Sequence, residues 1–333
     1  MTTIPPTVRR IGLLVIATLV WCSVGAPEVA LAAEKNRFDG ASRVPIKKVK
    51  GSQQNPCFSP DGRQLVITQW KRRYNGGKAN VLLIDLAAGR KLRQLSRMGA
   101  TSVNMPGSCW NAATNRITYA AEIGGPDSPF VVGADGVGEQ LVIQRNDQVG
   151  IEPTFSPDGE WLVFQSGVYD GEGPNQIFKV RRDGSELTQL TSGHNDTQPN
   201  WSPTGDRIVF QRQEGDGLDA AKPWDVFTMD VDGGQVRNVT NTADQNETDV
   251  SWSPSGRFLV FSGDGLDIQI ASLFAIAEDG TGRTQVTHTW GWYDGAPSWS
   301  PDGTRIAFEA RRGEPDGSGG TKIYLVNAPA GMQ

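Results

Sequence analysis

The sequence predicts an all-β fold in which six four-stranded repeats close into a ring. Two observations lead to this prediction. A turn motif recurs at nearly constant spacing, and a strand near the N-terminus supplies what the last repeat lacks. The motif is Ser-Pro-Asp-Gly or a close variant, preceded by Phe or Trp, and it begins at Ser59, Ser156, Ser202, Ser253 and Ser300. A fixed period of this size is typical of repeat architectures.

The spacing of the motif sets the number of repeats at six. The last four copies begin 46, 51 and 47 residues apart, whereas the first gap is 97 residues. A degenerate copy at residues 110–119 fills that gap. It keeps the leading aromatic residue and the apolar run but has lost the turn residues.

Each motif is expected to join two antiparallel strands. Proline at its second position presets φ for a type I turn, and glycine suits the fourth position. An alternating apolar run follows, as in residues 161–164. A third strand is predicted from stretches such as 80–85, and a fourth from stretches such as 184–190, after a glycine turn.

The last repeat predicts how the ring closes. Its strands at residues 305–309 and 322–326 are followed by no fourth strand, whereas residues 44–49 resemble a fourth strand and precede the first repeat. Pairing these segments closes the ring and removes exposed sheet edges. We therefore predict a six-bladed β-propeller rather than an open β-solenoid.

Residues 1–33 have the features of a secretory signal peptide. Arg9 and Arg10 precede an apolar run at residues 11–20, and small residues at 30–33 offer a cleavage site. The apolar run is shorter than the ~18 residues that a membrane span needs. We therefore expect the mature protein, residues 34–333, to be a periplasmic or secreted propeller that does not span a membrane and is a monomer.

The charge balance argues against a nucleic-acid partner. The chain has 37 acidic and 32 basic residues, and without residues 1–33 the net charge becomes −6. No basic stripe is available to replace phosphate counterions. The catalytic inventory is small, because His194 and His288 are the two histidines and no serine-hydrolase elbow or zinc motif is present.

Four polar residues share one position, three residues before the proline of the first strand or its equivalent. They are Gln53, Asp196, Glu247 and Asp294, while Met105 and Gly150 occupy the position in the other two repeats. In a ring these residues are expected to surround one mouth of the channel. The three carboxylates there are candidate ligands of Ca²⁺, which prefers oxygen ligands. They are equally suited to a basic peptide, or to capping the turn into the strand.

The loops between second and third strands extend the candidate site. They are acidic at residues 169–172, 216–219, 264–267 and 314–317 and basic at residues 71–74. The acidic loops are expected either to form a metal site or only to be solvated.

Aromatic residues stand close to the same loops. These are Trp290, Trp292, Tyr293 and Trp224. They are candidates for sugar stacking or a protein-binding hot spot, or for packing onto their blade.

Two cysteines remain after signal cleavage. Cys57 and Cys109 each precede the aromatic residue of the first strand in consecutive repeats. An exported compartment permits a disulfide between them, provided that their Cα atoms lie within ~7 Å.

The repeat resembles that of the TolB-like β-propeller family (PD40, WD40-like repeats). Residues 184–210 and 233–261 are its fullest copies, and the resemblance covers nearly all of residues 44–327. It implies a channel mouth that binds peptide segments of partner proteins and Ca²⁺. TolB resembles a propeller preceded by an α/β domain, whereas about 20 residues separate the signal peptide from the ring here.

The function expected from these features is non-catalytic binding of a protein or peptide partner at the acidic channel mouth. A Tol–Pal-like scaffold of the cell envelope is its concrete form. The alternative is a metal-dependent, carbohydrate- or lactone-active propeller enzyme. Oligogalacturonate lyases also resemble this repeat, but their metal site is rich in histidine.

Overall fold

The structure is a computed structural model that describes residues 40–75, 77–96, 103–105, 107–145, 147–168, 173–215, 222–264, 271–288, 291–313 and 320–333. The predicted signal peptide lies outside the described residues. All regular secondary structure within them is β-strand, arranged as six antiparallel sheets, one for each sequence repeat.

The first three blades follow the order of the chain. Blade 1 contains β2 (Ser52–Phe58), β3 (Gln64–Trp70), β4 (Ala79–Asp85) and β5 (Arg90–Gln94). Blade 2 contains β6 (Val103–Asn104), β7 (Trp110–Asn111), β8 (Arg116–Ala121), β9 (Ser128–Gly133) and β10 (Gln140–Leu141). Blade 3 contains β11 (Ile151–Phe155), β12 (Trp161–Ser166), β13 (Gln176–Arg181) and β14 (Thr188–Gln189).

The last three blades have the same plan. Blade 4 contains β15 (Asn195–Trp201), β16 (Arg207–Gln213), β17 (Trp224–Asp230) and β18 (Arg237–Asn238). Blade 5 contains β19 (Asn246–Trp252), β20 (Phe258–Asp264), β21 (Ser272–Ala277) and β22 (Thr284–Gln285). Blade 6 contains β23 (Trp292–Trp299), β24 (Arg305–Arg312), β25 (Lys322–Asn327) and β1 (Ser42–Arg43).

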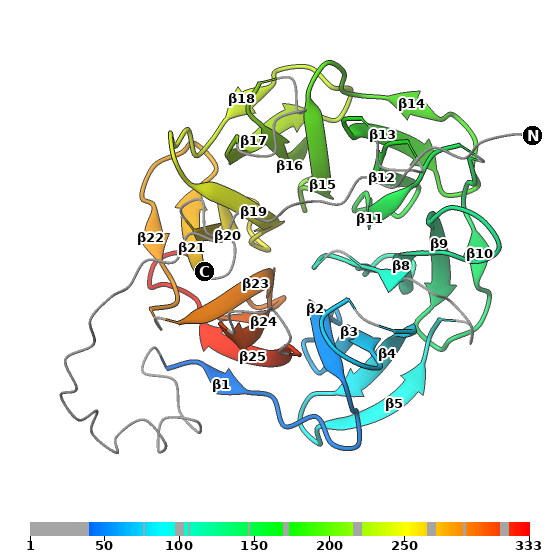
Figure 1. Cartoon of the computed structure of the whole chain (residues 1–333), viewed down its shortest axis with the longest axis vertical. Helices are drawn as coiled ribbons and strands as arrows, with labels where there is room; N and C mark the ends of the chain where they lie inside the picture. Colours follow the sequence, from blue (N-terminus) through cyan, green and yellow to red (C-terminus); the bar gives the residue numbers. More distant parts are fainter. Residues whose placement is uncertain are drawn as a thin grey trace, which may run out of the picture. The chain divides into compact units, whose positions relative to one another are not determined.

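The six blades surround a central axis, so the predicted six-bladed all-β propeller is confirmed (Figure 1). The first strand of each blade is innermost and the last forms the outer rim. Blade 2 departs from the plan, because its innermost strand is interrupted between β6 and β7, which both pair with β8.

The Ser-Pro-Asp-Gly turns are structural, as expected. In the first copy the Gly62 N–H donates to the Ser59 carbonyl over 2.9 Å, and Gly62 has φ of 69°. The Asp61 carboxylate accepts hydrogen bonds from Ser59 Oγ at 2.6 Å and the Arg63 N–H at 3.0 Å. The Ser59 bond, with the Arg63 bond, lowers the pKa of Asp61. The Asp61 carboxylate is therefore taken up by hydrogen bonds within its own turn.

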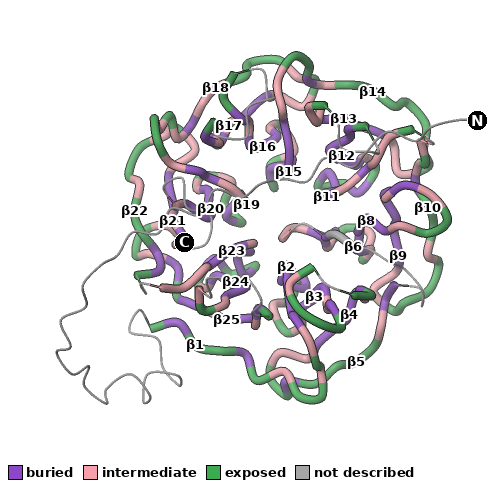
Figure 2. The backbone as a smooth tube through the Cα atoms, viewed as in Figure 1, coloured by how far each residue is buried: buried purple, intermediate pink, exposed green. Residues whose placement is uncertain are grey.

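The hydrophobic core is divided into six clusters, each between two adjacent blades. Between blades 4 and 5, Val209 and Val226 from one blade meet Trp252, Leu259 and Phe261 from the next. The other five interfaces have equivalent clusters, including the one between blades 6 and 1. Figure 2 shows the buried residues concentrated on the inner strands and the exposed ones on the outer rim. Each fully buried large apolar side chain stabilises the ring by about 1.5–3 kcal/mol.

Ring closure is confirmed, but the closing strand is shorter and earlier than predicted. Ser42 and Arg43 pair with Leu325 and Tyr324 of β25, and residues 44–49 do not continue the strand. The Val44 N–H still donates to the Ile323 carbonyl at 2.8 Å. The next residue is a proline, which lacks the N–H that a further ladder bond requires. The apolar side chains of residues 44–49 instead pack into the core between blades 6 and 1.

A disulfide joins the inner strand region of blade 1 to that of blade 2. Cys57 and Cys109 have Cα atoms 5.9 Å apart, and both are buried. The bond encloses a stretch of chain with a sequence separation of 52 residues. It fixes the blade with the interrupted inner strand to its neighbour.

We predict that replacing both cysteines, Cys57→Ser with Cys109→Ser, lowers the free energy of unfolding by about 2–4 kcal/mol, because the unfolded chain gains loop entropy. Urea unfolding of residues 34–333 measures this. The control is added reductant, which should destabilise the unsubstituted protein and leave the double variant unchanged. Two free thiols in unreduced, unfolded protein would contradict the bond.

Candidate functional site

The residues that face the channel are set by a bulge in the innermost strands. In five blades the register with the second strand breaks near the middle of the inner strand. The bulged residue has a left-handed backbone, with φ between 47° and 56°, and these residues are Asn55, Glu152, Gln198, Asp249 and Ala296. A bulge changes the direction in which the side chain at its position points. Here it places these residues around the axis of the ring.

Together with Gly107 of blade 2, the bulged residues line a small cavity near the axis of the ring, which we call the throat. Its cavity volume is about 30 Å³. That is room for one or two waters. The throat therefore separates two wider mouths, one on each face of the ring.

The throat is narrow partly because the interrupted strand of blade 2 reaches across the ring. The Asn55 side-chain amide donates to the Met105 carbonyl at 2.5 Å. Ser108 Oγ lies 3.4 Å from Ser251 Oγ, which belongs to blade 5 on the opposite side. A Cβ atom at Gly107 would lie 2.8 Å from the Pro297 carbonyl of blade 6. Only glycine fits this crossing without displacing the backbone.

Polar side chains in the throat are joined by hydrogen bonds. Gln198 Nε2 donates to Asp249 Oδ1 at 2.9 Å and to Glu152 Oε1 at 3.2 Å. The Asp249 N–H returns a bond to Gln198 Oε1 at 2.8 Å, and the Ala296 N–H donates to Asp249 Oδ2 at 3.0 Å. Burial raises the pKa of Asp249, which these hydrogen bonds oppose.

The bulges are held by residues from the second strand of the preceding blade. Gln165 Oε1 accepts from the Gln198 N–H at 2.7 Å, and Gln211 Oε1 accepts from the Asp249 N–H at 3.1 Å. At the closing interface the acceptor is a carboxylate, because Glu309 Oε2 accepts from the Asn55 N–H at 3.0 Å. Burial, together with the nearby Asp249 carboxylate, raises the pKa of Glu309 to about 8.

The wide mouth opens on the face opposite the Ser-Pro-Asp-Gly turns and has a volume of about 730 Å³. Its lining includes the aromatic residues Tyr74, Trp224 and Tyr293 and the cations Lys222 and Arg311. The Tyr74 and Tyr293 rings meet edge to face, with centroids 6.3 Å apart. The Arg311 guanidinium lies 5.5 Å and 5.1 Å from these two centroids.

Arg311 supplies the hydrogen-bond donors of the wide mouth. Its Nε and Nη1 atoms are buried and have no hydrogen-bond partner among the residues that the structure describes. A buried donor without a partner costs about 1–3 kcal/mol or more when charged. A ligand with a carbonyl or carboxylate oxygen would remove that cost.

The turn-side mouth lies on the other face and is smaller, about 330 Å³. It is lined by the aromatic residues that precede the turns, Trp110, Phe155, Trp201, Trp252 and Trp299. These side chains belong to the first strands and also pack between blades. The turn-side mouth is thus part of the structural repeat.

Two of the predicted site carboxylates are buried in ion pairs inside their blades. Asp196 is fully buried and receives two hydrogen bonds from Arg212, at 2.6 Å and 2.9 Å. Glu247 is fully buried and lies 2.5 Å from Arg283. Each arginine stacks over two phenylalanine rings of its blade. Both oxygens of Asp196 and one oxygen of Glu247, Oε1, therefore accept hydrogen bonds from these arginines.

Gln53 and Asp294 are also buried, with exposed fractions of 2 % and 1 %. Gln53 Nε2 donates to the Val49 carbonyl at 3.2 Å. The structure therefore does not bring the four predicted residues together at an open mouth. Among the described residues, no group of three or more His, Cys, Asp or Glu is placed to hold a metal. A role of these residues in binding stays a prediction.

The structure places the predicted aromatic residues in different surroundings. Tyr293 and Trp224 line the wide mouth, whereas Trp292 packs edge to face on Tyr324 of its own blade, 5.7 Å between centroids. Trp290 lies outside the described residues.

The predicted acidic loops at 169–172, 216–219 and 314–317 lie outside the described residues, as does most of 264–267. The described residue of that last loop, Asp264, lines the wide mouth. From the basic loop at 71–74, Tyr74 enters the wide mouth.

The sequence did contain a signal for the throat residues. Asn55, Glu152 and Gln198 each stand directly before the proline of the first strand, one position that holds a polar residue in several repeats. The predicted site residues Gln53 and Asp196 stand two positions earlier than Asn55 and Gln198. Because of the bulge, the side chain that faces the axis of the ring is that of the residue directly before the proline. Arg311 gave no comparable signal.

Comparison with known proteins now identifies the family. The model of the TolB beta propeller domain matches residues 36–292, so the chain belongs to the TolB β-propeller family.

Individual relatives agree with this assignment. The Tol-Pal system protein TolB of Francisella tularensis subsp. holarctica is 24% identical over 213 residues, which cover 63% of this chain and 46% of the relative. The chain thus spans less than half the length of the curated relatives it matches.

Solved structures show the same fold. A putative TolB from Agrobacterium tumefaciens superposes with a TM-score of 0.60 at 19% identity, covering 84% of this chain and 91% of that one. An oligogalacturonate lyase in complex with manganese superposes with a TM-score of 0.54 at 16% identity, covering 90% and 96%. At these identities the likeness concerns the fold.

We predict that Asp196→Ala destabilises the protein by about 3–5 kcal/mol, because it leaves the Arg212 charge in the blade without its partner. The matched control is Glu186→Ala, which breaks the exposed pair with Arg181 and should cost about 1 kcal/mol or less. Chemical denaturation of both variants measures this. Equal small losses would show that the Asp196 pair adds little to stability.

We predict that Glu309→Gln makes stability less dependent on pH. The folded-state pKa of about 8 lies above the ordinary value of 4.5, so the folded protein binds an extra proton between these values. Stability should therefore fall as pH rises through this window, by up to about 1.4 kcal/mol per pH unit.

Denaturation at pH 5, 7 and 9 tests this expectation. The glutamine keeps an acceptor for the Asn55 N–H, so the variant should resemble the unsubstituted protein at pH 5 and exceed its stability at pH 9. The exposed Glu160→Gln is the control and should leave the slope unchanged. Parallel pH profiles for the Glu309 variant and the unsubstituted protein would contradict the assignment.

Proposed function

We propose that this chain is an exported, non-catalytic propeller that binds a protein or peptide partner at the wide mouth. The proposal includes a signal peptide at residues 1–33 that is removed on export. The mature part, residues 34–333, is then a propeller working as a monomer in the periplasm or outside the cell. Among the described residues, no helix is long and apolar enough to span a membrane.

One observation carries the proposal. The wide mouth places two buried Arg311 donors, which have no partner within the described part of the chain, next to Tyr74, Tyr293 and Trp224 in a cavity of about 730 Å³. An extended peptide has both features that match, because its carbonyl or carboxylate oxygens accept from arginine and its apolar side chains pack on aromatic rings. Tryptophan, tyrosine and arginine are the residues enriched in protein-binding hot spots.

Family membership supports a role in the cell envelope. The matched Francisella protein is named as a Tol-Pal system protein, and the fold likeness includes a putative TolB. A Tol–Pal-like scaffold is the concrete form of the proposal. A basic partner segment would also meet Asp264 at the rim of the wide mouth, which gives a peptide polar contacts of both signs.

A second candidate function is a metal-dependent, carbohydrate- or lactone-active enzyme. Aromatic residues at the mouth of a propeller suit a sugar ring, and the fold resembles that of a manganese-bound oligogalacturonate lyase. In this case the protein should contain a stoichiometric divalent metal, and a chelator should remove an activity.

The test is affinity capture. Residues 34–333 are immobilised and exposed to envelope extract from the source organism, with and without Ca²⁺, and bound proteins are identified by mass spectrometry. We expect one dominant partner, and Trp224→Ala should weaken its binding at least about tenfold. Trp161→Ala is the matched control, because Trp161 is half-buried and does not line the wide mouth.

Equal capture by the Trp224 variant and the unsubstituted protein would contradict binding at the wide mouth. An empty eluate together with a stoichiometric metal would favour the enzyme.

A further inference from the structure

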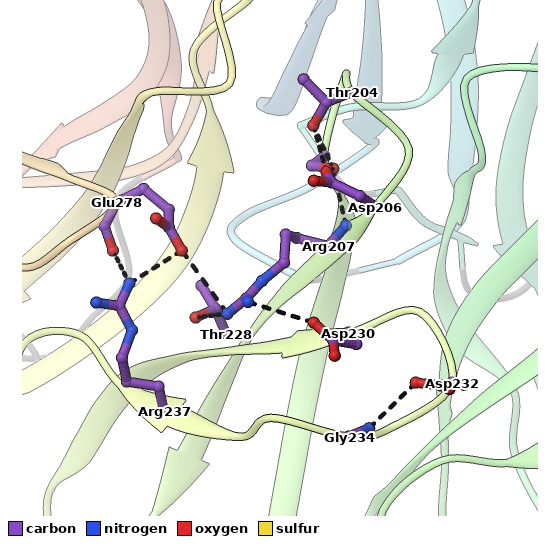
Figure 3. Close-up of polar contacts among 10 residues, drawn as sticks. Thr204, Asp206, Arg207, Thr228, Asp230, Asp232, Gly234, Arg237 and Glu278 are labelled. Atoms are coloured by element: carbon purple, nitrogen blue, oxygen red, sulfur yellow. Dashed lines mark hydrogen bonds and ion pairs between the residues drawn. The ribbon is translucent and has the colours of Figure 1, made fainter.

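The interface between blades 4 and 5 contains a carboxylate held by two arginines (Figure 3). Arg207, the first residue of β16, donates to Thr228 Oγ1 at 2.8 Å and to Asp230 Oδ1 at 3.3 Å. Its Nη2 atom also lies 3.7 Å from Oε1 of Glu278, which comes from blade 5. Arg237 of the outer strand donates to the same Glu278 Oε1 at 2.9 Å.

The interface between blades 6 and 1 has the same arginine without its partners. Arg305 is the first residue of β24 and pairs with Asn327, just as Arg207 pairs with Asp230. The register therefore makes Arg305 the counterpart of Arg207. The neutral amide Asn327 stands opposite Arg305, where the carboxylate Asp230 stands opposite Arg207.

The other two partners are replaced by leucine. Leu325 takes the place of Thr228, two residues before the paired Asn327 or Asp230. Leu86 takes the place of Glu278, because each donates its N–H to the residue that precedes the second strand of its blade. Arg305 is thus the counterpart of Arg207 in the closing interface. Where Arg207 has three polar partners, Arg305 has one amide and two leucines at the equivalent positions.

A cavity of about 740 Å³ opens at this place, and we call it the closure cavity because it lies beside β1. Three arginines line it, Arg43, Arg63 and Arg305. Leu86 and Leu325 supply apolar lining. Its volume is in the range of small-molecule sites, which are concave and largely apolar with a few convergent polar groups.

Two carboxylates, Asp61 and Asp85, line the closure cavity beside its three arginines. Asp61 Oδ1 accepts hydrogen bonds within its own turn, and Asp85 Oδ1 accepts from the Ala88 N–H at 2.9 Å. Among the described residues, none of the three arginines forms an ion pair. The closure cavity therefore has a surplus of positive charge next to an apolar surface.

We propose that the closure cavity binds a carboxylate that carries an apolar group. The carboxylate takes the position that Glu278 occupies between blades 4 and 5, and Arg305 donates to it. The apolar group packs on Leu86 and Leu325, which replace polar residues there. Such a ligand is either a free organic acid or the C-terminal end of a peptide with an apolar last residue.

The proposal rests on observations independent of the wide mouth. The two sites lie on opposite faces of the ring, since the closure cavity includes the Asp61–Gly62 turn and the wide mouth opens away from the turns. Loss of binding at one site leaves the other to be tested separately.

The test uses residues 34–333 and ligand-observed NMR titration with three probes. Hexanoate represents a free acid, acetyl-glycyl-leucine represents a peptide end, and hexanamide is the neutral analogue. We expect at least one acid to bind and hexanamide not to bind up to about 10 mM. Arg305→Ala and the exposed Arg63→Ala should each weaken the acid at least about tenfold, as expected for a lost charge-assisted hydrogen bond.

The matched control is Arg116→Ala. Arg116 is also the first residue of a second strand and is also half-buried, but it belongs to blade 2 and does not line the closure cavity. It should leave acid binding unchanged. Whichever acid binds more tightly identifies the source of the carboxylate.

Four results would overturn the proposal, and three of them concern the probes and the cavity variants. These are no binding of either acid at about 10 mM, equal binding of hexanamide, or the same affinity in the Arg305 and Arg63 variants as in the unsubstituted protein. Equal weakening by Arg116→Ala would also overturn it, because it would indicate a general charge effect.

Discussion

The whole structure depends on one constraint: a blade can bury its apolar faces only against its two neighbours. Six clusters between blades meet this need, and the cluster between blades 6 and 1 brings together residues as distant in sequence as Val44, Leu65 and Ile323. The ring is therefore complete only when both ends of the chain meet. Two strand residues, Ser42 and Arg43, make the ladder contact, while apolar side chains of residues 44–49 pack into the core between blades 6 and 1. Closure depends on packing more than on strand pairing.

The fold could be predicted from the sequence because its signals are local. A Ser-Pro-Asp-Gly turn determines its own geometry through the proline, the glycine and the serine–aspartate hydrogen bond, whatever surrounds it. The near-constant spacing of the last four copies, with the double gap before them filled by the degenerate copy at residues 110–119, then fixes the number of repeats at six. The bounds of the closing strand were less certain, because the alternation of residues 44–49 does not show that Pro45 ends the ladder.

The candidate site could not be predicted as well, because a bulge is a tertiary feature. An unbroken strand would have pointed Asp196 to one face and its neighbours to the other. The left-handed residue at Gln198 changes this alternation, so that Gln198 faces the axis and Asp196 pairs with Arg212 inside the blade. A polar residue before proline was visible in the sequence, but its orientation depends on contacts from the preceding blade. The Cys57–Cys109 bond depended likewise on a distance that only the ring defines.

The degenerate second repeat has a consequence for how the ring works. Met105, Gly107 and Ser108 lie outside the strands of blade 2, and Ser108 Oγ lies 3.4 Å from Ser251 Oγ on the far side of the axis. Gly107 and Ser108 of blade 2 thus lie close to blades 6 and 5, across the axis of the ring. The throat between the two mouths is a cavity of only about 30 Å³. The molecule is thus a two-sided platform rather than a pore, and its two faces can acquire different ligands independently.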